Sequence, residues 1–189
     1  WFLLLFACGA DKETVDTSVP PSPPESRHLV IQSPRSGDAF GAAIDLAAPH
    51  KLLIGAPGES QGRLYKWDLT TLTLFQEEQE DEAGALGSAV AWGPTGSAIA
   101  GAPLAQDGSG RVYSDGKIIL EGGRVLGGRL LNGPNGLVAA GSKDVVDGTS
   151  QTTHESRVAG LTIWNGSLAI GMPSGAVAVS NEEKTWARR

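Results

Sequence analysis

Short apolar segments alternate with turns rich in glycine, proline and asparagine from residue 37 onward. In the first part of this region the pattern predicts four strands, over about 39–46, 51–56, 62–68 and 71–77. The last of them alternates polar and apolar residues, as a half-buried strand does. Glycine-containing turns predict tight hairpins in the later part of the chain, at 94–96, 132–136 and 165–166. The pattern therefore predicts an all-β fold.

The same succession of segments occurs four times, in units of about 37–78, 83–121, 123–155 and 156–189. Two units match closely, since Phe40-Gly41 is followed by Gly55-Ala56-Pro57 and Leu86-Gly87 by Gly101-Ala102-Pro103. Two match more loosely, with Gly127 followed by Gly141, and Gly160 followed by Gly171 and Pro173. The leading glycines 41, 87, 127 and 160 are 46, 40 and 33 residues apart. Four-stranded units at such spacings are typical of propeller blades, with a glycine-rich β-sandwich or solenoid as the alternative.

Glycine content agrees with many strands and tight turns. Glycine accounts for 26 of 189 residues, about twice the ~7% of average usage. The absence of a Gly-X-Y period excludes collagen, and the absence of a long amphipathic stretch excludes a helix bundle. Inner strands of blades converge on an axis, so we expect small residues to permit close approach there, namely Gly41, Ala42, Gly87 and Ser88.

The paired motifs at 40–41 with 55–57, and at 86–87 with 101–103, resemble the FG-GAP repeats of integrin alpha-chain β-propellers and their bacterial relatives. The resemblance covers about residues 29–180 and implies blades of four antiparallel strands. Because family members commonly have seven blades, two alternatives follow. Either four blades form a small ring, which residues 29–33 close by joining the last blade, or the chain is part of a larger propeller. We favour the second alternative.

The first residues are predicted to be the end of a targeting segment. The apolar run 1–7 is too short to span a bilayer but fits the end of a secretory signal. Leu5-Phe6-Ala7-Cys8 resembles a bacterial lipoprotein box, which implies a lipidated Cys8, with an incidental cysteine as the alternative. Residues 8–27 are rich in proline and serine and predict a disordered tether ahead of a propeller domain at 28–189. These features predict an exported, lipid-anchored protein of the bacterial cell envelope, at the outer membrane or cell surface.

Charge and residue spacing exclude several functions. The 15 basic and 21 acidic residues give a net charge of −6, which argues against a nucleic-acid partner. The histidines, His28, His50 and His154, are far apart in sequence, so no zinc site is expected and surface positions are predicted. No nucleophile elbow or phosphate-binding loop occurs. We therefore predict a non-enzymatic protein.

Calcium is not expected either. The family resemblance implies that calcium would bind in aspartate-rich loops between the FG and GAP strands. The corresponding segments here, 45–51, 93–97, 133–136 and 165–166, retain a single carboxylate, Asp45. Asp144 and Asp147 are three residues apart and are placed in another loop, 143–156. The sequence therefore predicts no cofactor.

The resemblance also implies a ligand-binding face, formed by the loops after each GAP strand and the connections between blades. This face would carry Arg35, Asp38, Glu59, Asp107, Lys143, Asp144 and Asp147. The leading hypothesis is an adhesion or scaffold protein that binds a protein or glycan partner and meets the membrane only through its lipid. The alternatives are an accessory propeller domain of a larger secreted enzyme, and a truncated gene fragment.

Overall fold

The computed structural model describes residues 30–47, 49–58, 61–78, 84–133, 136–148, 150–154, 157–164, 167–173, 175, 177–180 and 186–188. The chain divides into two compact units, 1–32 and 33–189. In the first unit, residues 30–32 form no strand, and the Val30 side chain is 81% exposed. Cys8 and the proposed tether lie outside the described residues.

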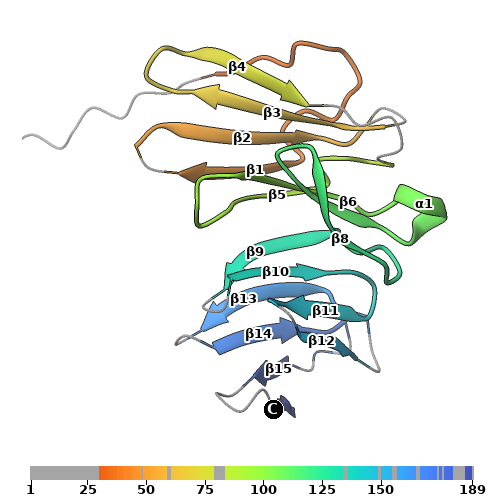
Figure 1. The fold of residues 1–189 in the computed structure, drawn as a ribbon. Helices are drawn as coiled ribbons and strands as arrows, with labels where there is room; N and C mark the ends of the chain where they lie inside the picture. The colour runs from red at the N-terminus through yellow and green to blue at the C-terminus, as the bar shows by residue number, and fades with distance from the viewer. Residues whose placement is uncertain are drawn as a thin grey trace, which may run out of the picture. The chain divides into compact units, whose positions relative to one another are not determined.

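The described part of the second unit contains four antiparallel four-stranded sheets, each with its strands in chain order (Figure 1). Sheet 1 comprises β1 (Ala43–Ala47), β2 (Lys51–Ala56), β3 (Arg63–Asp68) and β4 (Thr73–Glu78). Sheet 2 comprises β5 (Ala89–Trp92), β6 (Ala98–Ala102), β7 (Arg111–Ser114) and β8 (Lys117–Glu121). Sheet 3 comprises β9 (Arg129–Gly133), β10 (Gly136–Ala140), β11 (Asp144–Asp147) and β12 (Ser150–Thr153). Sheet 4 comprises β13 (Gly160–Trp164), β14 (Ser167–Gly171), β15 (Val177–Ser180) and β16 (Trp186–Arg188).

These sheets confirm the all-β prediction of four four-stranded units. The hairpin between β5 and β6 is closed by the Gly93 N–H, which donates to the Ser97 carbonyl at 2.8 Å. Under the ring alternative residues 29–33 would join the last blade, but the described residues 30–33 form no strand and the fourth strand of sheet 4 is β16. The prediction of a loop over 143–156 was wrong. Residues 144–147 and 150–153, predicted as part of a loop, form β11 and β12 because Val145 and Val146 are buried and Gly148, at φ 59°, turns the chain.

The motif glycines lie in turns before the first strands, not inside these strands. Sheet 1 begins at Ala43 and not near 39, because Ala39 (φ 54°) and Gly41 (φ 88°) are left-handed and the Ala42 N–H donates to the Ala39 carbonyl at 3.1 Å. The same turn, with positive φ at the first and third residues, recurs at Ala85-Leu86-Gly87 and Val125-Leu126-Gly127. The expectation that Gly41 and Gly87 are strand residues was therefore wrong.

Each sheet packs face to face against the next through its own hydrophobic cluster. Directly paired residues share a face of an antiparallel sheet, so the registers sort side chains between the two faces. Leu53 and Leu64 of sheet 1 meet Val90 and Trp92 of sheet 2. The opposite face of sheet 2 packs on sheet 3, and the far face of sheet 3 packs on sheet 4. Three clusters thus join four consecutive sheets.

Glycine pairs bring the first three sheets into close backbone contact. A Cβ added at Gly55 would lie 2.0 Å from the Gly87 carbonyl oxygen, and one at Gly101 would lie 1.9 Å from that of Gly127. Because real Cβ atoms do not approach other atoms so closely, only glycine fits at these positions. Close approach therefore occurs between one sheet and the turn that precedes the next sheet. Its prediction is confirmed for Gly87 and was wrong for Gly41, where an added Cβ would meet no atom within 4 Å.

The fourth unit departs from this pattern. Its Ala159 N–H donates to the Gly171 carbonyl at 2.8 Å, as the Gly87 N–H donates to the Gly101 carbonyl at 3.0 Å. Ala159, rather than Gly160, therefore occupies the place of the leading glycine, and the predicted alignment of this unit is one residue out of register. An alanine is accommodated because no left-handed turn precedes β13 among the described residues.

Candidate functional site

The second strand of each sheet ends at the edge where the first strand begins, because neighbouring strands are antiparallel. The β6–β7 connection contains the short helix α1 (Ala105–Gly108), and residues 141–143 join β10 to β11. These connections, with the turns at 39–42, 85–88 and 125–128, form what we call the loop edge. The opposite edge carries the hairpins between first and second strands and is called the hairpin edge.

Three residues of the predicted binding face, Arg35, Asp107 and Lys143, are exposed. Asp107 belongs to α1 and Lys143 to the β10–β11 connection, so both lie at the loop edge. Asp107 is left-handed, at φ 56°. Glu59 lies outside the described residues. The structure therefore provides exposed side chains of both charges for this face.

Asp38 was wrongly predicted to be a surface binding residue. Its side chain is 1% exposed and accepts hydrogen bonds from three groups of its surroundings. These donors are the Ser33 hydroxyl at 2.9 Å, the Phe40 N–H at 3.1 Å and the Tyr65 hydroxyl at 3.2 Å. Phe40 also packs edge-on against the Tyr65 ring. Asp38 thus fixes the segment before β1 against sheet 1 and is unavailable to a partner.

Asp144 and Asp147 do not lie together on one face. They occupy opposite ends of β11, so that Asp144 is at the loop edge and Asp147 is paired with Val138 toward the hairpin edge. Asp144 Oδ1 accepts a hydrogen bond from the Thr153 hydroxyl at 2.6 Å. Strand formation separates the two carboxyl groups, which a loop would have allowed to converge. Of this pair, Asp144 alone remains part of the loop edge.

Asp45 lies within β1 and binds the neighbouring sheet. Its Oδ2 accepts a hydrogen bond from the Trp92 N–H at 2.7 Å, so this carboxylate links β1 to β5. Within the described ranges, no group of three or more His, Cys, Asp or Glu side chains is placed to hold a metal ion.

The prediction of surface histidines was wrong for His154, which is 8% exposed. This residue is packed beside the β10–β11 connection, where its backbone N–H donates to the Lys143 carbonyl at 2.8 Å.

An ion pair joins sheets 1 and 2. Lys66 Nζ, on a side chain that is 5% exposed, donates to Asp115 Oδ1 at 2.9 Å. Partial burial works to raise the pKa of Asp115. The hydrogen bond from Lys66, that from the Ala98 N–H at 3.1 Å and the charge of Lys66 outweigh it and hold this pKa below its ordinary value of 3.8. The pair is structural, since Lys66 is buried.

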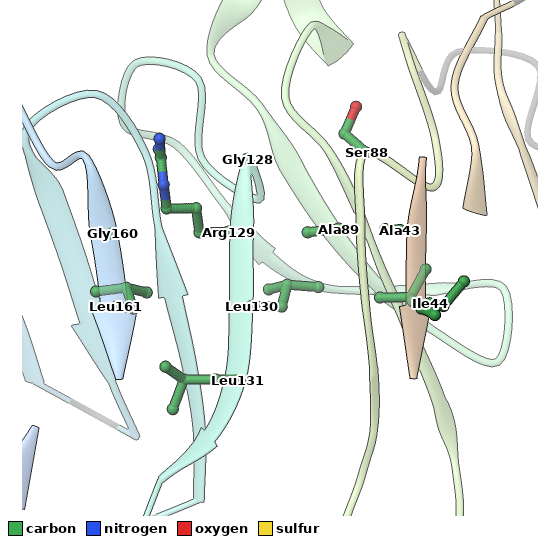
Figure 2. Close-up of a pocket in the computed structure, with 11 residues that line it drawn as sticks. Ala43, Ile44, Ser88, Ala89, Gly128, Arg129, Leu130, Leu131, Gly160 and Leu161 are labelled. Carbon is green, nitrogen blue, oxygen red and sulfur yellow. The ribbon is translucent and has the colours of Figure 1, made fainter. Parts of the chain in front are cut away.

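The first strands of all four sheets line one cavity of about 390 Å³, which sequence reasoning did not find. Its lining residues are Ala43, Ile44, Ser88, Ala89, Val90, Gly128, Arg129, Leu130, Leu131, Gly160 and Leu161. Figure 2 shows Ser88 and Arg129 toward one end and Leu131 at the other. Arg129 is the first residue of β9 and Ser88 directly precedes β5, so the polar end of the cavity faces the loop edge.

Arg129 is the charged residue of this lining. Its Nε donates to the Ala159 carbonyl at 3.0 Å, which holds the guanidinium between β9 and β13 (Figure 2). Counted from the leading residue of each unit, Arg129 occupies the place of Ala43, Ala89 and Leu161. In the sequence, Arg129 stands out as a charged residue at a position that is small or apolar in the other units. The sequence alone could not link this residue to a cavity, because it does not show that the four first strands meet.

The described residues include no helix long and apolar enough to cross a membrane. No family model matches the sequence, and no curated protein matches it. Among solved structures, the chain is similar to the crystal structure of the computationally designed Ika4 protein, with a TM-score of 0.58 and 19% identity. The match covers 82% of this chain and 98% of that chain. At this identity the similarity concerns the fold alone.

Proposed function

We propose that the four sheets are blades of an FG-GAP-type β-propeller, and that the protein is a non-enzymatic binding protein of the bacterial envelope. The observation that carries the proposal is the convergence of all four first strands on one cavity. Consecutive face-to-face packing of four-stranded sheets agrees with blade architecture. The two close repeats of the motif support the family.

The loop edge is the proposed partner-binding surface. Connections on one edge of a rigid scaffold are free to vary and to carry binding residues. Exposed Asp107 and Lys143 lie there, on the edge that the polar end of the cavity faces. A protein or glycan of mixed polarity fits this surface, because both signs of charge are present. Lipidation of Cys8 would keep the protein at the membrane, with the tether of residues 8–27 between the lipid and the propeller domain.

Substitutions that change the charge of the loop edge and of the hairpin edge test the proposal. The full-length chain, Asp107→Lys, Lys143→Glu and the hairpin-edge control Thr95→Lys would be measured against immobilised peptidoglycan fragments, a neutral glucan, an acidic polysaccharide and purified envelope proteins. We expect at least one probe to bind, and the loop-edge changes to weaken it about tenfold, or ~1.4 kcal/mol. Thr95 is exposed in the β5–β6 hairpin, so its change should have no effect.

Three results would overturn the proposal. They are failure of every probe to bind, binding that neither Asp107→Lys nor Lys143→Glu weakens, and loss of binding in Thr95→Lys alone. The envelope location has its own test, which is incorporation of labelled fatty acid into the wild type and its loss in Cys8→Ser. Equal labelling of the two proteins would exclude lipidation at this cysteine.

A further inference from the structure

The cavity between the first strands has an amphipathic lining. Ile44, Val90, Leu130, Leu131 and Leu161 provide an apolar wall, whereas Arg129 provides the positive charge. The Ile44 side chain is 68% exposed, which is unusual for an apolar strand residue and leaves this wall accessible. At about 390 Å³ the cavity falls in the lower part of the range of small-molecule sites, roughly 300–1,000 Å³.

The Arg129 guanidinium is held in place and retains donors for a ligand. Its Nε is engaged by the Ala159 carbonyl at 3.0 Å, which fixes the plane of the group. The two terminal nitrogens take no part in this hydrogen bond, and no acidic side chain in the described ranges pairs with them. None of the other lining residues is ionisable. A planar guanidinium in this situation suits bidentate binding of a carboxylate.

We propose that the cavity binds a small aliphatic carboxylate, with its carboxylate on Arg129 and its alkyl chain against Leu131 and Leu161, which lie on the same side of β9 as Arg129. Ser88 is not a donor for this ligand, because its hydroxyl already donates to the Ala85 carbonyl at 2.8 Å. The anion is therefore recognised by Arg129 alone. This inference names a ligand for the polar end of the loop edge, and so rests on the proposed binding function.

Titration of the full-length chain with three six-carbon probes tests the inference. Hexanoate, hexanol and hexylamine share one alkyl chain and differ in the head group. Binding would be followed by the backbone amide NMR signals of Gly128, Leu130 and Leu161. We expect saturable shifts with hexanoate, with an affinity about tenfold higher than for hexanol. Hexylamine should not bind, because its charge repels Arg129.

Two variants separate the roles of charge and space. Arg129→Gln should reduce hexanoate affinity about tenfold and bring it to that of hexanol. Gly160→Val should weaken both probes, since a Cβ at Gly160 meets no atom within 4 Å and the new side chain would occupy space at the cavity without a backbone clash. Arg157→Gln is the matched control, because Arg157 is exposed and does not line the cavity.

The inference is overturned if hexanoate and hexanol bind equally, if Arg129→Gln leaves hexanoate binding unchanged, or if the shifts occur away from the cavity. Failure of the proposed partner-binding function would give a different set of results. The loop-edge variants Asp107→Lys and Lys143→Glu would then leave partner binding intact, while hexanoate still bound at Arg129. Because Gly160→Val tests the site independently, misfolding of an Arg129 variant would not hide the result.

Discussion

Sheets 2 and 3 contact each other in a different way from sheets 3 and 4. At the former, Gly101 lies against Gly127, and the left-handed turn of unit 3 brings two backbones into contact. At the latter, Ala159 replaces the turn glycine, and the Val158 N–H donates to the Ser142 carbonyl at 2.8 Å. The close contact between glycines is thus found where the left-handed turn inserts. Between sheets 3 and 4, a backbone hydrogen bond and the buried side-chain cluster hold the sheets together without it.

The largest expected effect is that of a single methyl group at a glycine contact. Gly101→Ala would place a Cβ 1.9 Å from the Gly127 carbonyl oxygen, so the two sheets must separate. We expect a loss of unfolding free energy of about 3 kcal/mol or more. The measurement is urea denaturation followed by tryptophan fluorescence.

Gly171→Ala is the matched control in sheet 4. There the new Cβ would lie 3.9 Å from its nearest neighbour, the Gly160 nitrogen. Because the φ angle of Gly171 is not positive, the change should alter stability by less than about 1 kcal/mol, in the stabilising direction. Equal destabilisation by the two substitutions would remove the distinction between the interfaces.

A moderate effect is expected at the ion pair that distinguishes the interface between sheets 1 and 2. Because the folded pKa of Asp115 is depressed, the stability it contributes is present above the unfolded value near 3.9 and is lost as pH falls through the folded value. Asp115→Asn should cost about 1 kcal/mol at pH 7, a value reduced for solvent screening of the half-exposed carboxyl. The cost should shrink once the pH is below the folded pKa.

Denaturation of both proteins across this pH range measures the effect. Asparagine suits the position because it tolerates the left-handed backbone of Asp115, at φ 46°. Asp107→Asn is the control, since this aspartate is also left-handed and exposed but is not the partner of Lys66. A cost that stays constant with pH would show that the charge of Asp115 is not what stabilises the interface.

The smallest expected effect concerns the turns themselves. Val125 is β-branched and left-handed, at φ 62°, which is a strained combination. Val125→Gly should raise stability by about 0.5–1 kcal/mol through relief of this strain. Arg157, at the equivalent place of unit 4, has no positive φ, so Arg157→Gly should lower stability by a few tenths of a kcal/mol. Changes of the same sign in thermal melting would show that the two turns do not differ in strain.

Much of the architecture was predictable because local patterns encode it. The spacing of apolar segments placed the four units, and the strands of unit 1 were located to within a few residues except at the start of β1. Unit 3 was read less well. Its 144–147 segment is a short strand with aspartates at both ends, a pattern that resembles a loop when partners are unknown.

The sequence by itself determined the fold class and the number of four-stranded units, because these depend on local periodicity. Only the tertiary structure decided what each charged residue does. Asp38 is buried by Tyr65, Asp45 binds the backbone of another sheet, and Arg129 enters a cavity formed by four strands. The burial and the hydrogen-bond partners of these charged residues depend on segments that are distant in the chain. The spacing of residues along the sequence therefore does not predict them.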